Sequence, residues 1–257
     1  MNIAIDTAFD AYSDTPEGRD PDSHSPTLRR YHQKLWSKRL PDGTPFTLST
    51  DHPKAYLHHS SHRGEFFLSS DGIGHTYRYV KAMAPIIDQM PKEELDQFFS
   101  IASTVGAYVI FPSQRIDKKN TINGARGMHW KIRDRFDLTL ECIRRHYDNE
   151  ESPLSETLLR YGAFFELFGT FKNYVEFFLL QDLVYEDSSS IKFFIPFSGF
   201  DAPPLPATIQ DYLLYKERLI AFIIARNSRI AGSQAGSFRA EPEGHFAKRL
   251  KALPGCC

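Results

Sequence analysis

The sequence predicts an α+β fold that is mainly helical and carries a small β-sheet. From about Tyr77 onward, apolar residues recur at helical spacing over most of the chain. Short runs of β-branched and aromatic residues, closed by proline or glycine, interrupt this pattern and are typical of strands. The 257 residues include 21 Phe and 12 Tyr, which suffice for a substantial core. We therefore expect one compact domain over residues 1–230.

Composition narrows the class of protein. A charged fraction of 25% with a formal net charge of −1 is ordinary for a globular protein and argues against nonspecific coating of nucleic acid. The three cysteines form no disulfide framework and fit a reducing compartment. The start of the chain has no secretory pattern, and the most apolar stretch, residues 174–185, is too short to span a bilayer. These features predict a cytoplasmic protein that does not bind a membrane.

The sequence of residues 6–77 predicts turns, one helix and short strands. Residues 6–24 are rich in Asp, Pro and Gly, which favour turns. Ser25 is placed to cap a helix, because Pro26 follows at the first helical position. We expect this helix to end before the turn at residues 40–43, and short strands to alternate with loops between residues 44 and 77.

The remaining elements are mostly helices. A short β-branched and aromatic run predicts a strand over residues 106–111, and a similar run predicts another over residues 190–197. Helical spacing predicts further helices at residues 80–87, 92–104, 127–147, 153–184 and 208–230. Residues 231–257 are small, polar and aperiodic, and we expect them to form a flexible tail.

The run from Asn120 to Tyr147 carries the densest mixture of opposite charges among apolar positions. Such density is typical either of a functional site or of a partly buried ion-pair network, and the pattern leaves both readings open. Asp137 and Glu141 lie one helical turn apart, close enough for two carboxylates to share a metal ion or a proton. They are the catalytic residues we would expect if the protein is an enzyme, a question that the sequence leaves open.

An anionic ligand would suit the beginning of this segment. Gly124 and Gly127 bracket a turn before the expected helix, and helix N-termini present free N–H groups to phosphate or carboxylate. The residues predicted to bind the ligand are Asn123, Arg126, Lys131, Arg135 and Arg144, with Arg29, Arg30 and His32 as second-tier candidates. No complete catalytic or phosphate-loop signature occurs, so the sequence leaves any cofactor unknown.

Two groups of metal-ligand residue types have simpler interpretations. Carboxylates at the start of the chain could hold Mg²⁺ or Ca²⁺, but Asp is also an ordinary turn residue; they are Asp10, Asp14, Asp20 and Asp22. Histidines that could bind zinc lie among strand-like segments without a nearby cysteine; they are His52, His58, His59, His62 and His75. We therefore predict no metal site.

Charge is uneven along the chain. Residues 1–25 hold six acids and one base, whereas residues 115–148 hold nine bases and five acids. Opposite charges of this size attract within one molecule, although the basic segment could instead face an anionic ligand. We expect the two segments to pair within the fold.

Several stretches resemble one family of uncharacterised bacterial proteins. They are DPDSHSPTLRRYHQKLWSK (20–38), FFLSSDGIGHTY (66–77), TINGARG (121–127), DRFDLTLECIRRHY (134–147) and FFLLQDLV (177–184). The resemblance spans about residues 9–230 and implies a single unit, a bacterial origin and a cytoplasmic location. It implies no activity, cofactor or site residue.

Two functional hypotheses follow from these observations. The leading one is binding or processing of an anionic ligand, a nucleotide or nucleic acid, in a pocket at the start of the charged helix. The alternative is a non-enzymatic protein that binds a protein partner, in which the charged helix is purely structural. A pocket that contains Arg126 together with Asp137 and Glu141 would favour the first hypothesis.

Overall fold

Two antiparallel sheets form the β-part of the molecule. The computed structural model describes residues 4–187 and 190–237. Strands β3 (Leu57–Ser61), β4 (Gly64–Gly72) and β5 (Tyr108–Pro112) make a three-stranded sheet in that order, with Leu68 of β4 opposite both Leu57 and Pro112. Strands β1 (Lys38–Arg39) and β2 (Pro45–Phe46) pair in a second, two-stranded sheet. With ten helices among the described residues, the fold is α+β, as predicted.

The helices occupy most of the remaining chain. They are α1 (Pro21–His24), α2 (Pro26–Trp36), α3 (Ala84–Ile87), α4 (Lys92–Ala102), α5 (Ile122–Met128), α6 (Phe136–Tyr147), α7 (Ser155–Arg160), α8 (Gly162–Glu166), α9 (Phe171–Phe177) and α10 (Ile209–Ser237). Three 3₁₀ turns, η1 (Lys81–Met83), η2 (Val105–Ala107) and η3 (Gln181–Leu183), join them. Within the described residues, no helix has the length and apolar character needed to cross a membrane.

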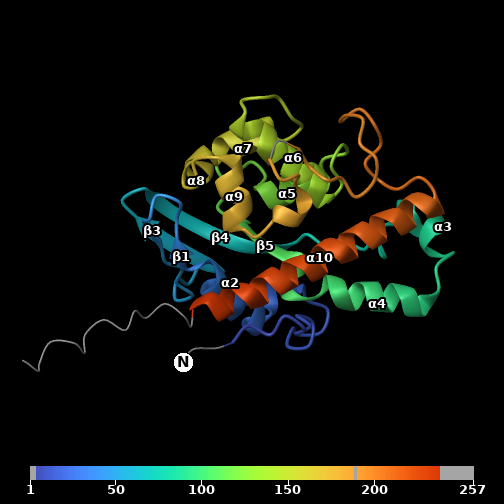
Figure 1. Ribbon diagram of the computed structural model, residues 1–257, viewed down its shortest axis with the longest axis horizontal. Helices are drawn as coiled ribbons and strands as arrows, with labels where there is room; N and C mark the ends of the chain where they lie inside the picture. The colour runs from blue at the N-terminus through green and yellow to red at the C-terminus, as the bar shows by residue number, and fades with distance from the viewer. Residues whose placement is uncertain (1–3, 188–189, 238–257) are drawn as a thin grey trace, which may run out of the picture.

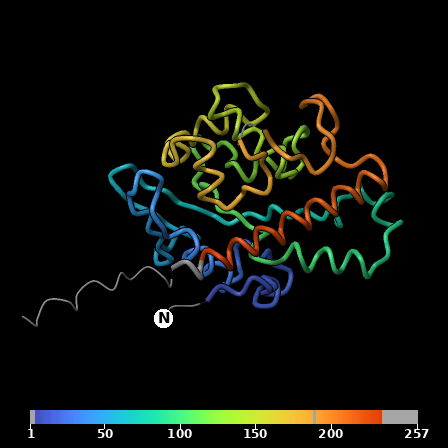
Figure 2. The backbone as a smooth tube through the Cα atoms, viewed as in Figure 1, coloured from blue at the N-terminus to red at the C-terminus, as the bar shows by residue number. Residues whose placement is uncertain are grey.

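The long helix α10 lies between two groups of shorter helices (Figure 1). Figure 1 shows α10 running along the long axis, with the short helices α5–α9 on one side and α2 and α4 on the other. It packs against α4 and η2, which lead into β5. The N-terminal segment lies on the α4 side (Figure 2), where the N–H of Ala11 donates to the carbonyl of Ser103. Buried apolar side chains from Ile5 to Ile230 join in one cluster.

Local signals predicted the early elements correctly. The Ser25 hydroxyl accepts a hydrogen bond from the N–H of Leu28 at 3.0 Å, and Pro26 is the first residue of α2. This is the cap expected from the Ser-Pro pair. Strand β5 also lies where the β-branched run predicted it.

The predicted strand over residues 190–197 is wrong. Only an isolated bridge between Val184 and Ile191 forms there. Lys192 N–H donates to the Leu183 carbonyl beside this bridge, but farther along side chains take the place of a neighbouring strand. Phe194 N–H donates to Asp137, and the Phe193 carbonyl accepts from Arg218. Long-range side-chain partners of this kind cannot be inferred from a local apolar pattern.

Two predicted helices have different bounds. The expected helix over residues 153–184 is divided into α7, α8 and α9, with Gly169 in the left-handed region (φ 72°) before the Thr170 cap of α9. The last helix continues to Ser237, so residues 231–237 of the expected tail are helical. The rest of that tail, residues 238–257, lies outside the described residues.

The charged helix begins at Phe136, not at residue 127. Arg133 and Asp134 have φ values of 48° and 62°, so the backbone leaves the helical region just before α6. Residues 129–135 therefore form a loop, which we call the 129–135 loop, between α5 and α6. The glycine-bracketed turn expected at residues 124–127 is part of α5.

Candidate ligand-binding groove

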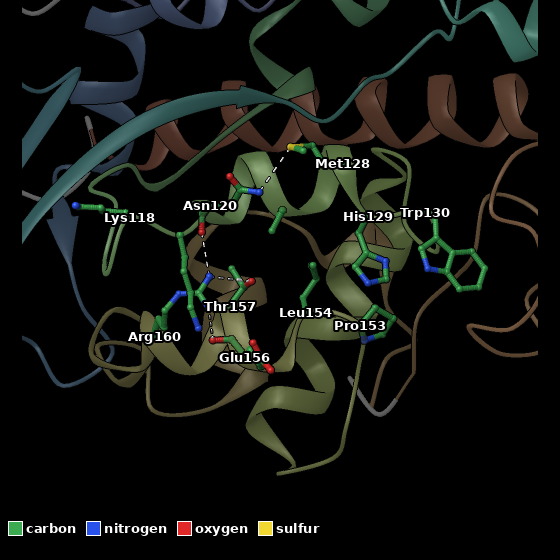
Figure 3. A pocket seen from close by; sticks show the side chains of 12 residues that line it. Lys118, Asn120, Met128, His129, Trp130, Pro153, Leu154, Glu156, Thr157 and Arg160 are labelled. Atoms are coloured by element: carbon green, nitrogen blue, oxygen red, sulfur yellow. Dashed lines mark hydrogen bonds between the residues drawn. The ribbon is translucent and has the colours of Figure 1, made fainter.

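A groove of about 590 Å³ lies between α5 and α7. The residue 118–120 segment, the groove-facing side of α5, the start of the 129–135 loop and α7 supply its walls. Figure 3 shows Lys118 and Arg160 at one end of this groove and His129 and Trp130 at the other. We call it the α5–α7 groove. Its volume falls within the range of sites for small organic ligands.

Helix α5 has a groove side and a core side. The Thr121 hydroxyl accepts from Gly124 N–H at 3.3 Å and so caps the helix. Ala125 and Met128 line the groove, while Ile122 and Arg126 are buried on the other side. The core-side anchors of this helix therefore hold one wall of the groove.

Arg126 is the main polar anchor of α5. Its Nη1 lies 2.6 Å from Asp71 Oδ2 on β4 and 3.3 Å from Asp134 Oδ1 in the 129–135 loop. Its Nη2 donates to the Asp134 carbonyl at 2.8 Å, and its Nε donates to the Thr139 hydroxyl on α6 at 3.1 Å. One buried guanidinium thus ties the helix to the sheet, to α6 and to the 129–135 loop. It is not free to bind phosphate.

The 129–135 loop is fixed at several other points. The Tyr77 hydroxyl donates to the Arg133 carbonyl at 3.1 Å, and the Ile132 side chain is fully buried. Left-handed backbone at two successive non-glycine residues costs about 1–2 kcal/mol per residue, so the surrounding contacts must hold it. The loop is consequently well placed to present its exposed residues in a fixed geometry.

The aromatic end of the groove consists of His129 and Trp130. Their rings are nearly parallel, with an interplanar angle of 14° and centroids 6.4 Å apart, and they lie side by side in Figure 3. Trp130 is 59% exposed, although an indole of this size is usually much more buried. Lys131 Nζ lies 5.0 Å from the Trp130 ring centroid and 2.8 Å from Asp201 Oδ1. Lys131 therefore makes a cation–π contact with Trp130 while Asp201 balances its charge.

His129 presents a hydrogen-bond donor at this end. Its Nδ1 accepts the N–H of Lys131 at 3.2 Å, which assigns the proton of the neutral ring to Nε2. Burial, followed by the nearby Lys131, lowers the pKa of His129 below its ordinary value. The ring is therefore neutral at physiological pH.

The basic end consists of Lys118, Lys119 and Arg160. Lys118 follows Asp117 in a turn where both residues have left-handed backbone, with φ values of 59° and 53°. Arg160 donates to the carbonyls of Asn120 and Glu156, each at 3.1 Å, so its partners there are neutral. Across the described chain, no ion pair neutralises any of the three cations. One carboxylate, Glu156, also lines the groove, which leaves an excess of positive charge.

Asp71, behind the groove, is an unusual carboxyl. Its side chain is 15% exposed, and it shares the Arg126 guanidinium with Asp134. Burial raises the pKa of Asp71 to about 7; Arg126 opposes this shift and Asp134 reinforces it. Near neutral pH this group therefore carries a proton part of the time.

The structure does not bring Arg126 together with Asp137 and Glu141. Asp137 is fully buried and accepts from Arg135 and from the N–H of Phe194. Glu141 accepts from Arg144 at 2.8 Å and from Arg145 at 2.7 Å. Each carboxylate thus has its own arginine partner, as expected of the ion-pair reading of this segment.

The other predicted ligand-binding residues are also dispersed. Arg135 is buried against Asp137, and Asn123 donates to the Ser70 carbonyl at 3.3 Å. Arg29 donates to the Thr50 and Ala55 carbonyls, while the exposed Arg30 donates to the Thr27 hydroxyl. His32 is buried in the core, and Arg144 also pairs with Asp148 and Glu150. Lys131 alone of this set adjoins the groove.

The acidic start and the histidines have local partners. Asp14 accepts from the Ser25 hydroxyl and from Thr27 N–H, so it supports the start of α2. His58 Nε2 lies 2.8 Å from Glu65 Oε1 across the β3–β4 pair. Over residues 4–187 and 190–237, no cluster of three or more potential metal ligands occurs.

The expected pairing of the acidic start with the basic segment is wrong for the described residues. No ion pair there joins residues 4–25 to residues 115–148. The acids of the first segment cap backbone N–H groups nearby: Asp6 accepts from Ala8, and Asp10 accepts from Tyr12. Local caps satisfy these carboxylates without any long-range partner.

Sequence reasoning missed the residues that line the groove. Arg160 is distant in sequence from Lys118 and Lys119, and no sequence pattern singles out Trp130. The positive excess of residues 115–148 and the expected ligand site at Gly124 and Gly127 did point to this region. They could not show which of the bases are paired.

Fold and groove together define an α+β protein with a cationic and aromatic surface site. The model of the family of unknown function DUF6994 matches residues 5–230. The chain therefore belongs to this family, which confirms the resemblance seen in its sequence. Neither the curated proteins nor the solved structures gave a match.

Proposed function

We propose that the protein binds a nucleotide in the α5–α7 groove. The proposal rests on the difference between the two ends of one cavity of about 590 Å³. Unpaired cations line one end, and the nearly parallel rings of His129 and Trp130 line the other. A nucleotide has the same division, with an anionic phosphate and a planar base.

Phosphate would contact the Lys118, Lys119 and Arg160 end. Lysine ammonium groups bind phosphate as point charges, and arginine adds directed N–H donors. The carbonyls that accept from Arg160 hold it in place without cancelling its charge. An anion bound here replaces no existing ion pair, so its Coulomb energy is not offset by breaking one.

The base would lie on the Trp130 ring. Stacking on an exposed aromatic side chain contributes about 1–3 kcal/mol per base. Met128, which is 72% exposed and whose Sδ lies 3.6 Å from Asn120 Nδ2, offers a polarisable apolar contact elsewhere along the groove. The Nε2–H of His129 would donate a hydrogen bond to an acceptor on the base or the sugar.

Titration with ATP, adenosine and inorganic phosphate tests the proposal. We expect ATP to bind more tightly than either part alone, because it alone reaches both ends of the groove. A Lys118→Ala/Lys119→Ala double variant should weaken ATP binding about tenfold, which corresponds to about 1.4 kcal/mol. A Trp130→Ala variant should weaken ATP and adenosine but leave phosphate binding unchanged.

Lys92→Ala is the matched control, because Lys92 is an exposed lysine on α4, a helix that contributes nothing to the groove. It should bind ATP as the wild type does. Equal affinities in the wild type, the double lysine variant and the Trp130 variant would reject the proposal. Stronger binding of a short oligonucleotide than of ATP would keep the site but extend its ligand to nucleic acid.

A cytoplasmic location and a bacterial origin are part of the same proposal. Nucleotides are abundant in that compartment, and the few cysteines of the chain fit its reducing conditions. Fractionation of the source cells, followed by immunodetection, would test the location.

A further inference from the structure

Helix α7 forms one wall of the α5–α7 groove. In Figure 3, Pro153, which precedes this helix, lies toward His129 at the aromatic end, and Arg160, its last residue, lies at the basic end. An α-helix rises about 1.5 Å per residue, so Glu156 precedes Arg160 by roughly 6 Å along this wall. Glu156, which also lines the groove, therefore lies between the two ends, where the sugar of a bound nucleotide would be.

The core holds α7 in place. Leu154 and Leu158 are buried, and Thr157 is only 8% exposed. The helix packs against α5 and α6. Glu156 is itself exposed, so its side chain extends from a firmly packed helix toward solvent.

The Glu156 carboxylate is unpaired. A glutamate and an arginine four residues apart on a helix usually form an ion pair. Here Arg160 instead donates to the main-chain carbonyls of Glu156 and Asn120, each at 3.1 Å, and to the Thr157 hydroxyl at 3.2 Å. Of the ion pairs among the described residues, none includes Glu156. The carboxylate is therefore available to accept hydrogen bonds from a ligand.

Charge decides which part of a nucleotide can contact this carboxylate. Phosphate oxygens are anionic, so direct contact with Glu156 would be repulsive. The base would lie on Trp130, at the far end of the groove. The ribose hydroxyls remain, and they can donate hydrogen bonds. Hydrogen bonds to an ionised acceptor are stronger than those between neutral groups, and acidic side chains bind ribose hydroxyls in this way in dinucleotide-binding folds.

We propose that the Glu156 carboxylate accepts hydrogen bonds from the ribose hydroxyls of the bound nucleotide, so that the groove selects ribonucleotides over deoxyribonucleotides. This inference rests on the proposed nucleotide function and adds its sugar specificity. A ligand that lacks the hydroxyl leaves the carboxylate without a donor, which is how a polar site rejects such an analogue.

Calorimetric titration of the full chain with ATP, 2′-deoxy-ATP and 3′-deoxy-ATP tests this assignment. The three ligands share one base and one triphosphate and differ only in their sugar hydroxyls. We expect ATP to bind about tenfold more tightly than the weaker of the two deoxy analogues. Equal affinities for all three would overturn the ribose contact, while the nucleotide proposal would still stand on the lysine and Trp130 variants. If none of the three binds, both proposals fail.

Glu156→Ala locates the contact. This variant should bind ATP and the deoxy analogues equally, so the ratio of their dissociation constants should fall from about ten to about one. Loss of a negative charge beside the phosphates strengthens all three ligands alike, so this ratio is the readout. Glu217→Ala is the charge-matched control, because Glu217 is exposed on α10 and does not line the groove; it should keep the wild-type ratio. A preference for ATP that persists in Glu156→Ala would refute the role of this carboxylate.

A magnesium ion is the other partner that a carboxylate near phosphate could bind. Titrations in Mg²⁺ and in EDTA separate the two roles. We expect the preference for ribose to be the same in both. If Glu156→Ala weakens all three nucleotides equally, and only in Mg²⁺, the carboxylate binds a metal ion carried by the phosphates and the ribose assignment is wrong.

Discussion

Arg126 Nη1 and Asp71 Oδ2 lie 2.6 Å apart on the core side of α5, the helix whose other side lines the groove. The arginine predicted to hold a ligand therefore anchors the wall of the site. The same guanidinium binds the Asp134 carboxylate and carbonyl, so it also holds the loop that carries Trp130. A buried ion pair and one wall of the groove thus lie on two sides of one short helix.

Replacing Arg126 should lower the free energy of unfolding substantially. Arg126→Met leaves Asp71 and Asp134 without their shared cation, and breaking one side of a buried pair costs roughly 3–5 kcal/mol. Urea unfolding at pH 8 measures the loss. Arg30→Met is the control, because Arg30 is exposed and, among the described residues, bonds only to Thr27; it should change stability by no more than about 0.5 kcal/mol. Equal losses in the two variants would contradict the anchoring role.

The protonation of Asp71 should be visible in the pH dependence of stability. Its pKa is raised from 3.8 to about 7, chiefly by burial. Between these values the folded protein holds a proton that the unfolded chain has released. The stabilising contribution of this carboxyl is therefore fully present below about pH 3.8 and is lost as the pH rises through about 7.

Asp71→Asn should remove this contribution. The stability difference between wild type and the variant should shift against the wild type as the pH rises from 5 to 8. Asp201→Asn is the reference, because the pKa of the exposed Asp201 is lowered by its hydrogen bond to Lys131, which puts its titration below this range. A parallel pair of curves for wild type and Asp71→Asn would show that Asp71 is ionised throughout.

The two tryptophans should report on different parts of the molecule. Trp36 is fully buried, whereas Trp130 is exposed at the groove. Trp130→Phe should leave an emission that acrylamide quenches poorly, and Trp36→Phe an emission that it quenches well. If the groove binds nucleotide, ATP should quench Trp36→Phe but not Trp130→Phe. The reverse pattern would place the ligand in or near the core.

Asp137 and Glu141 should differ in their effect on stability. Asp137 is fully buried and accepts from Arg135 and from a backbone N–H, so Asp137→Asn should cost roughly 3–5 kcal/mol. Glu141 pairs with two arginines that have other partners or remain part-exposed, so Glu141→Gln should cost about 1–2 kcal/mol. Chemical denaturation compares them. If Asp137→Asn were as stable as the wild type, the buried pair would not be structural and Asp137 would again be a candidate functional residue.

The sequence predictions were correct where the interactions are local and wrong where they join residues that are distant in sequence. The Ser25 cap and strand β5 depend on residues within a few positions, and both formed as expected. The strand at residues 190–197 failed because its backbone groups find Asp137 and Arg218, which are distant in sequence. The groove was missed for the same reason, since Lys118 and Arg160 meet only after α5 and α7 pack together.

Positive φ at non-glycine residues was the other source of error. Aspartate adopts left-handed backbone more often than most residues, but arginine does not, so the residue types of Arg133 and Asp134 do not predict two such residues in succession. The loop there depends on Arg126 and Tyr77, which bind the Asp134 and Arg133 carbonyls from outside. Sequence patterns therefore gave the fold class and the basic region but not the geometry of the site.

A pair of glycine substitutions should separate close packing from open surface. A Cβ at Gly106 would lie 2.5 Å from Asn227 Oδ1 and 2.9 Å from the Ile223 carbonyl on α10. Gly106→Ala should therefore force η2 away from α10 and cost at least about 2 kcal/mol. A Cβ at Gly162, in α8, would meet nothing within 4 Å, so Gly162→Ala should be neutral or stabilise by about 0.4–1 kcal/mol. Similar stabilities for the two variants would mean that α10 and η2 are not in close contact.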